Sequence, residues 1–310
     1  MQHIGTVLVT SLVSALFVAA PDAHAHVAAA APEEGEEEEG DNNDSQGSRP
    51  GAEQGEGERG ERGAPEDTAE AAACPTIYQS PATYRANYET APVDLGPTTM
   101  VAQNPVPYMN LAQGEQGKRG WAMYNALLAL KATNAEIRAA FVGKGRPIDI
   151  ASALLAVWTN WDALEKQGLV AAKSGSAADD LADVYAKRLG LDCSGFVGNW
   201  ARANGSTAVG PETPVTDWAA NSRVNFQRKS LAAVCPGDVI QYKNAGHVAV
   251  IAEIDRARDR VFVIESCAET GCVGLQSEWH TIRHNSEGTF TIQQEARTRT
   301  DHPVYIAPVL

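Results

Sequence analysis

Leu191-Asp192-Cys193-Ser194-Gly195-Phe196-Val197 decides the fold, because this stretch places a cysteine in the first turn of a predicted helix. From the cysteine onward, apolar residues recur at positions 193, 196, 197, 200 and 201, the spacing of a helix with one buried face. Asp192 is a favourable N-cap, and Asn204-Gly205 supplies a stop signal. We therefore expect a helix whose buried face begins at Cys193.

The N-terminus of a helix favours an anion, because its first backbone N–H groups are unpaired and the helix dipole is positive there. Cys193 thus lies where the thiolate of a nucleophile would be stabilised. The alternative is a small buried cysteine that only packs, which for a lone cysteine is the more common case. A downstream histidine at the start of a strand would favour the catalytic interpretation.

His247 is such a histidine, since it opens the predicted strand His247-Val248-Ala249-Val250-Ile251. A strand over 237–242 precedes it, and a third apolar run, Val261-Phe262-Val263-Ile264, ends in Glu265. The charged segment 255–260 predicts a solvated turn, so the last two strands should form an antiparallel hairpin.

The centre of this turn decides which residues face each other. If the turn centre lies near Arg256, His247 is opposite Glu265 on the same face of the hairpin. The alternative is that the pairing register of the two strands differs by one or two residues. An acid beside an imidazole orients the ring and stabilises its cation, the third role in a Cys-His-acid triad. The candidate catalytic residues are therefore Cys193, His247 and Glu265.

These motifs carry a family resemblance. The residues Asp192-Cys193-Ser194-Gly195-Phe196-Val197, Gly237-Asp238-Val239 and Gly246-His247-Val248-Ala249-Val250 resemble the NlpC-type papain-like family of bacterial cell-wall peptidases, and the histidine strand is also similar to the related CHAP amidases. The likeness covers residues 180–310. The Tyr-x-Trp-Gly-Gly stretch typical of NlpC-type members is missing from the segment 185–190 before the cysteine.

The resemblance implies an α+β, papain-like fold in which an antiparallel sheet packs against a helical half that carries the nucleophile. It assigns Cys193 as nucleophile, His247 as general base and Glu265 as the residue that orients His247. The implied partner is peptidoglycan, cut at an amide bond of its stem peptides or cross-bridges, with no cofactor. Two other functions stay open: an antibacterial amidase toxin or acyl transferase on the same fold, and a non-catalytic cell-wall-binding protein.

The chain divides into four predicted parts. Residues 1–25 resemble a secretory signal peptide, with an uncleaved anchor as the alternative, so we expect a secreted or periplasmic protein. Residues 26–73 form a predicted disordered acidic tail. Residues 74–178 should form a strap and a helical region, and residues 179–310 the hydrolase domain. Within the helical region, an apolar stripe from Ile150 to Leu164 predicts one helix, begun by Pro147 and stopped by Gly168, whose tryptophans pack in the core.

Charge says little about partners, because the tail holds 15 acidic and 3 basic residues and so carries −12 of the formal net charge of −14. The rest of the chain is nearly neutral. No glycine-rich phosphate loop follows a strand, so nucleotide chemistry has no support, and no internal segment is long enough to span a membrane. We predict no nucleic-acid partner and no stable membrane insertion. The oligomeric state is left open.

The other cysteines, Cys74, Cys235, Cys267 and Cys272, are even in number and fit disulfides in an exported protein. Three pairings are open, one of which joins Cys74 to Cys235 and Cys267 to Cys272. His280 and His284 have the spacing of two metal ligands on a helix, but the residues between them favour a strand or loop and include no glutamate. We therefore predict no metal site.

Overall fold

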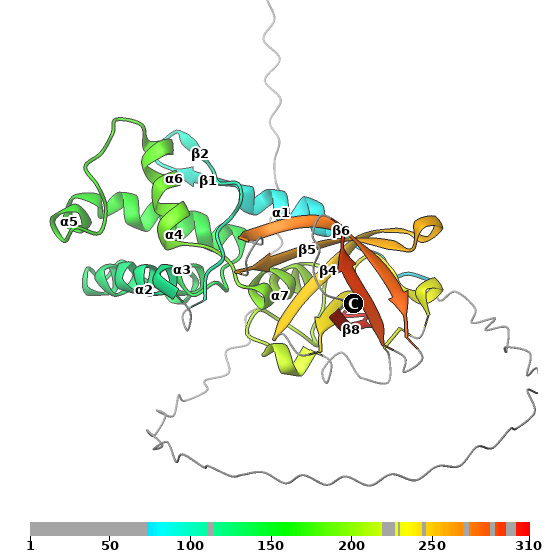
Figure 1. Ribbon diagram of the computed structural model, residues 1–310. Coiled ribbons are helices and arrows are strands. Elements are labelled where there is room, and N and C mark those ends of the chain that lie inside the picture. The colour runs from blue at the N-terminus through cyan, green and yellow to red at the C-terminus, as the bar shows by residue number, and fades with distance from the viewer. Residues whose placement is uncertain are drawn as a thin grey trace, which may run out of the picture. The chain divides into compact units, whose positions relative to one another are not determined.

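The structure is a computed structural model that describes residues 73–110, 114–218, 227–228, 230–243, 246–268, 273–285, 289–295 and 302–310. The predicted signal peptide and all but the last residue of the predicted tail lie outside these ranges. Pro65–Leu310 forms one compact unit, with helices in its first half and strands in its second (Figure 1). None of the described helices combines the length and the apolar character that crossing a membrane requires.

Local chemistry explains where the helices begin. Ser80 accepts a hydrogen bond from the backbone N–H of Thr83 at the start of the first helix, and Asn134 caps the third in the same way. The helices before the nucleophile are α1 (Pro81–Glu89), α2 (Gly114–Ala129), α3 (Ala135–Phe141), α4 (Pro147–Thr159), α5 (Trp161–Lys166) and α6 (Ala177–Arg188). A hairpin of β1 (Thr90–Asp94) and β2 (Thr98–Ala102) follows α1 and packs against α4 and α6.

The apolar stripe between Ile150 and Leu164 is divided between α4 and α5, so the prediction of a single helix is wrong. Pro147 does begin α4, but the helix ends before Asn160, whose side-chain amide donates to the carbonyl of Ala156 at 2.8 Å. Such a side chain competes with the backbone for helical hydrogen bonds, which favours a break. The two tryptophans of the stripe pack edge to face across this break, with ring centroids 5.5 Å apart.

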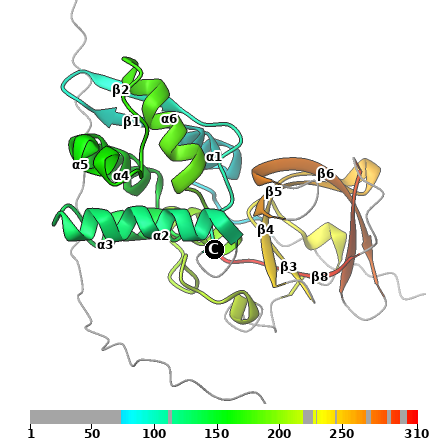
Figure 2. The same cartoon turned by 60° about the vertical axis from the view of Figure 1, so that its left-hand side comes forward.

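Six strands form a closed antiparallel barrel in which each strand pairs with its sequence neighbours and the last pairs with the first (Figure 2). The strands are β3 (Val239–Tyr242), β4 (His247–Asp255), β5 (Arg260–Cys267), β6 (Gly274–His284), β7 (Phe290–Gln294) and β8 (His302–Ala307). The expected α+β class with antiparallel strands is confirmed. Closure of the barrel was not predicted, because it depends on the pairing of β3 with β8, two strands far apart in the sequence.

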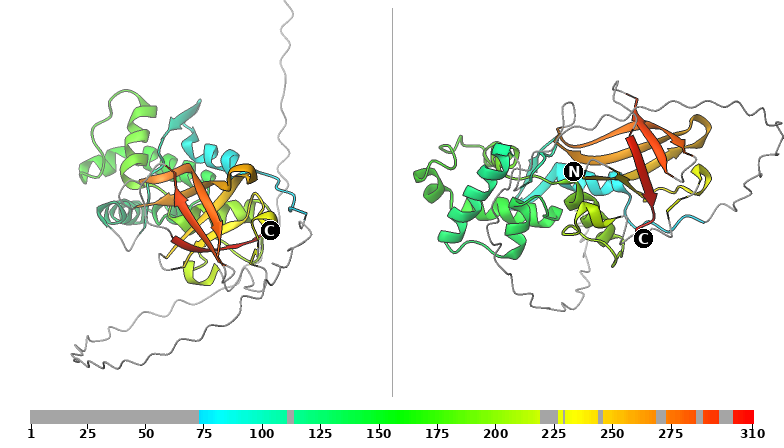
Figure 3. Two further views of the ribbon diagram at one scale, coloured as in Figure 1. Left: turned by 45° about the vertical axis from the view of Figure 1, so that its right-hand side comes forward. Right: turned by 60° about the horizontal axis from the view of Figure 1, so that its bottom comes forward.

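Alternating residues on β4 and β5 face opposite sides of the barrel wall. Val248, Val250 and Ile264 point outward into the core shared with α7 (Cys193–Ala203), whereas Ala249 and Val263 belong to the core inside the barrel. Helix α7 therefore lies on the outer surface of β4 and β5 (Figure 3).

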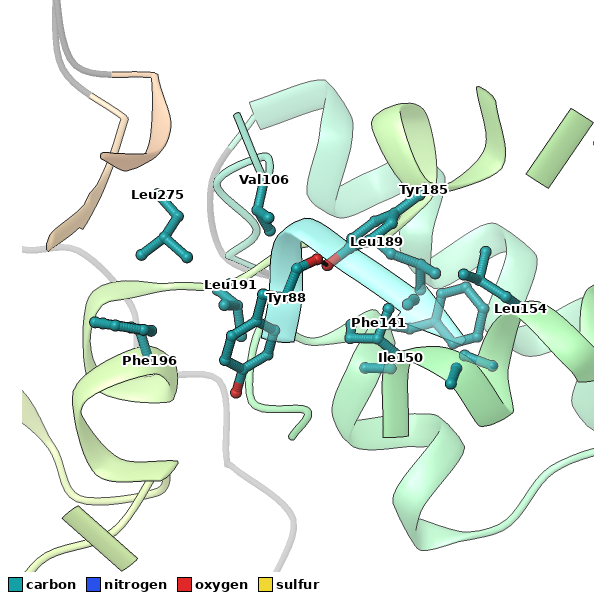
Figure 4. Packing of buried hydrophobic residues seen from close by; sticks show 14 of the residues in the cluster. Tyr88, Val106, Phe141, Ile150, Leu154, Tyr185, Leu189, Leu191, Phe196 and Leu275 are labelled. Carbon is teal, nitrogen blue, oxygen red and sulfur yellow. Dashed lines mark hydrogen bonds between the residues drawn. The ribbon is translucent and has the colours of Figure 1, made fainter. Parts of the chain in front are cut away.

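The outer core continues from the barrel into the helical half. Figure 4 shows Leu275 of β6 and Phe196 of α7 in the same cluster as Tyr88, Phe141 and other residues of the helices. Because this cluster includes residues from both 74–178 and 179–310, the helical half directly supports the helix that carries Cys193.

One predicted disulfide pairing is present. Cys74 is bonded to Cys235, which joins the segment before α1 to the segment before β3. Cys267 is also disulfide-bonded, while Cys193 is a free cysteine. Cys272 lies outside the described residues.

Candidate active site

Helix α7 begins at Cys193 as the sequence predicts. The Asp192 carboxylate caps the helix by accepting a hydrogen bond from the backbone N–H of Gly195 at 2.6 Å. The Cys193 side chain is largely buried but forms part of the wall of a cleft. The thiol therefore lies at the positive end of a helix and faces a space that a substrate could enter.

A loop from the helical half supports the start of α7. The carbonyl of Gly143 accepts a hydrogen bond from the backbone N–H of Asp192 at 3.0 Å. The loop passes so close that a Cβ on Gly195 would lie 1.9 Å from this carbonyl oxygen. Gly143 itself has a φ of 82°, a left-handed conformation that favours glycine. The two glycines thus allow the loop to lie against the nucleophile helix.

Lys144, between two glycines of this loop, reaches the cap of α7. Its ammonium group is 2.8 Å from one oxygen of Asp192 and donates to the Ser194 hydroxyl at 2.6 Å. Burial raises the pKa of Asp192, and the charge and hydrogen bonds of Lys144 oppose this shift. Lys144 therefore offsets a carboxylate charge beside Cys193 that would otherwise disfavour a thiolate.

His247 and Glu265 meet, although the predicted register is wrong. Val250 pairs with Ile264, and at this register Cys267, not Glu265, would lie opposite His247. The difference arises because the turn extends to Asp259 and the register shifts again at a bulge between Ile251 and Glu253. A shift of two residues keeps both side chains on the same face. His247 Nε2 lies 2.7 Å from Glu265 Oε2, as a diagonal pair.

Hydrogen bonding joins all three predicted residues. Burial lowers the pKa of His247, but hydrogen bonds to Cys193 and Glu265 outweigh burial and raise that pKa from 6.5 to about 10. Since Nε2 contacts Glu265, Nδ1 is the ring nitrogen left for Cys193. Burial raises the pKa of Glu265, but the hydrogen bond and charge of His247 lower it from 4.5 to about 2. His247 is therefore held as an imidazolium between the cysteine and a carboxylate.

The cleft beside Cys193 has a volume of about 530 Å³. Its walls come from the start of α7, the end of the barrel near His247, and the segment 212–215, whose last residue begins η1 (Val215–Asp217). Trp218, just after η1, is buried and donates from its ring N–H to the carbonyl of Thr213 at 3.1 Å. It thus supports the wall and does not line the cleft.

Tyr108 lines the same cleft and was missed by sequence reasoning. A single parallel bridge joins Tyr108 to Leu191, two residues before the nucleophile, and the backbone N–H of Met109 donates to the Leu191 carbonyl at 3.1 Å. The pKa of Tyr108 is raised to about 12, mainly by burial. A hydrogen bond from Asn110 opposes this increase, and the charge of Cys193 adds to it. The phenol therefore stays protonated as a donor near the sulfur.

Lys144 was also missed, although its setting Gly143-Lys144-Gly145 could have indicated a tight turn. No sequence signal connects Tyr108 or Lys144 to the cysteine, because both contacts are made across the fold.

Three residues that could bind a metal lie together in the structure, and they are not the pair His280 and His284 that the sequence analysis considered. His280 and His284 lie on β6, so they do not share a helix face. Instead, one ligand atom each of Glu265, Glu278 and His280 lie within 4.8 Å of one another inside the barrel. These three residues could hold a cation, although Glu265 is already hydrogen-bonded to His247.

Comparisons of the chain with protein-family models, with curated proteins and with solved structures found no match.

Proposed function

We propose that the protein is an exported papain-like cysteine peptidase or amidase that hydrolyses amide bonds of peptidoglycan peptides. The observation that carries this proposal is His247, which bridges the free cysteine at a helix N-terminus and a buried carboxylate at the edge of a cleft. An imidazolium next to the sulfur stabilises the thiolate that such an enzyme needs. A nucleophile helix packed on antiparallel strands supports the papain-like assignment, and the motif resemblance supplies the substrate class.

The reaction follows from the positions of these groups. Cys193 Sγ attacks the carbonyl carbon of the scissile amide, and the carbonyl electron pair moves to oxygen. Backbone N–H groups at the start of α7 and the Tyr108 hydroxyl, which lines the same cleft, would donate hydrogen bonds to this oxyanion. The C–N bond then breaks as His247 gives its proton to the leaving amine, which leaves a thioester on Cys193.

Deacylation reverses the roles. Neutral His247 removes a proton from a water molecule, which attacks the thioester carbonyl. The C–S bond breaks, the peptide carboxylate leaves, and the proton held by His247 again pairs with the Cys193 thiolate. Glu265 keeps the ring in the tautomer and orientation that both steps require.

Mass spectrometry of digested muropeptides tests the proposal. Purified peptidoglycan and soluble muropeptides are incubated with the wild type and with Cys193→Ala, and new fragments should form with the wild type alone. The mass of each fragment identifies the bond that is cut. Cys193→Ala should still sediment with insoluble peptidoglycan, since the cleft is intact. Sedimentation of both proteins without any fragment would contradict hydrolysis and favour a wall-binding protein.

A further inference from the structure

Two glutamines lie against the oxygen of Glu265 that does not face His247. Gln294 Nε2 is 3.3 Å from Glu265 Oε1, and Gln276 Nε2 is 3.4 Å from the same atom. The other oxygen, Oε2, is the one that contacts His247 at 2.7 Å and lies 3.5 Å from the Tyr242 hydroxyl. Each oxygen of the carboxylate thus has its own group of donors.

The barrel places these donors by strand pairing. Gln276 on β6 is the direct partner of Glu265 on β5. Gln294 on β7 is the direct partner of His280 on β6, and its side chain reaches Glu265 through the barrel interior. Glu265 and Gln294 are 2% and 5% exposed, so water does not replace these hydrogen bonds.

A buried carboxylate is stable only when donors satisfy both of its oxygens. We propose, on the basis of the function proposed above, that Gln294 and Gln276 are positioning residues that hold the Glu265 carboxylate aimed at His247. Neither glutamine touches the cleft, so both act through Glu265 and not on substrate.

Titratable groups on three strands also face Glu265. They are His247 on β4, Tyr242 on β3, and Glu278 and His280 on β6. Without an amide donor on Oε1, the carboxylate can turn away from His247, and its hydrogen bond to the imidazole weakens. Cys193 should then react more slowly, because the imidazole beside it is no longer held in place.

The test is the rate of Cys193 alkylation by iodoacetamide as a function of pH, which requires no substrate. Gln294→Met keeps a similar volume and removes the donor. We expect its rate of Cys193 alkylation at mildly acidic pH to fall about tenfold. Gln276→Met, at a less buried position, should lower this rate as well. Gln293→Met is the matched control, because Gln293 is the neighbour of Gln294 whose side chain is on the other face of β7.

Epistasis separates positioning from simple loss of packing. In a Glu265→Ala background, Gln294→Met should leave the alkylation profile unchanged, because no carboxylate remains to be held. With muropeptide substrate, Gln294→Met should lower kcat and leave KM nearly unchanged. A profile of Gln294→Met and Gln276→Met that overlays the wild type and Gln293→Met would overturn the proposal. If the rate falls but the wild type cuts no muropeptide, positioning is supported and the proposed function fails.

Discussion

At the residue scale, Tyr108 is the least expected component of the site. It comes from the segment before α2, and the bridge to Leu191 brings its hydroxyl to the cleft wall beside Cys193. Because its pKa is raised to about 12, the hydroxyl stays protonated near neutral pH and can act as a donor. A hydrogen bond to a developing oxyanion is the role that such a donor can fill.

Tyr108→Phe should therefore lower kcat about 10- to 100-fold with little change in KM, since the hydrogen bond forms mainly in the transition state. The measurement is steady-state cleavage of a muropeptide. Tyr78→Phe is the control, because Tyr78 is 82% exposed and away from the cleft. Equal turnover of Tyr108→Phe and the control would exclude the hydroxyl from the oxyanion site.

The charges of His247 and Glu265 predict how stability depends on pH. The pKa of His247 rises from 6.5 to about 10 on folding, so its contribution is complete below pH 6.5 and is lost as the pH rises towards about 10. The pKa of Glu265 falls from 4.5 to about 2, so its contribution is complete above pH 4.5 and is lost as the pH falls towards about 2.

The measurement is the thermal midpoint of the wild type and of Glu265→Gln across this range. The difference between the two should be largest between pH 4.5 and 6.5 and should shrink in both directions. A difference that stays constant with pH would show that Glu265 contributes by packing and not by charge.

That Cys193, His247 and Glu265 meet at one site was predictable from sequence, because each lies in a local pattern. The cysteine follows a helix cap, the histidine opens a strand, and the acid closes the next strand. Parity then placed the last two on one face even though the register was off by two residues. Tyr108 and Lys144 had no such pattern, because their contacts depend on how distant segments pack.

At the element scale, the close contact between the loop 143–145 and α7 links the helical half to the nucleophile. Gly195→Ala would place a methyl group against the carbonyl of Gly143, and the loop would have to move. We expect a loss of unfolding free energy of about 3 kcal/mol, together with a lower rate of Cys193 alkylation as Lys144 is displaced from Asp192. Urea unfolding and iodoacetamide labelling measure the two effects.

Gly205→Ala is the matched control, at the other end of the same helix. It has open space around the added methyl group and a φ of 90°, so it should cost about 1–2 kcal/mol from backbone strain alone and leave alkylation unchanged. Similar alkylation rates in Gly195→Ala and Gly205→Ala would mean that the loop does not influence the thiol.

Elements with one buried face were predictable from the sequence, whereas a helix break and a strand bulge were not. Periodicity identified the helix at Cys193 and the strands β3, β4 and β5, since one face of each is buried. Periodicity did not reveal the break at Asn160, because the apolar stripe continues across it. It also did not reveal the bulge between Ile251 and Glu253, which appears only when two strands pair.

At the scale of the whole molecule, the Cys74–Cys235 disulfide spans 161 residues of sequence. Cross-linking so long a loop restricts the unfolded chain, so the double variant Cys74→Ser, Cys235→Ser should lose about 2–5 kcal/mol of unfolding free energy. Urea unfolding without reductant provides the measurement. Cys193→Ser, which leaves the disulfide intact, serves as the control and should unfold near the wild-type midpoint. Coincident unfolding curves for the two variants would exclude this contribution.

The same disulfide determines what a single break in the chain would do. The disulfide closes the peptide from Cys74 to Cys235 into a covalent ring, and this ring contains Cys193. His247 and Glu265 lie on the linear segment that follows the ring. A protease that nicks the ring opens it but releases nothing until a reductant is added. A nick between Cys235 and His247 instead leaves Cys193 and His247 on separate polypeptides, joined by packing alone.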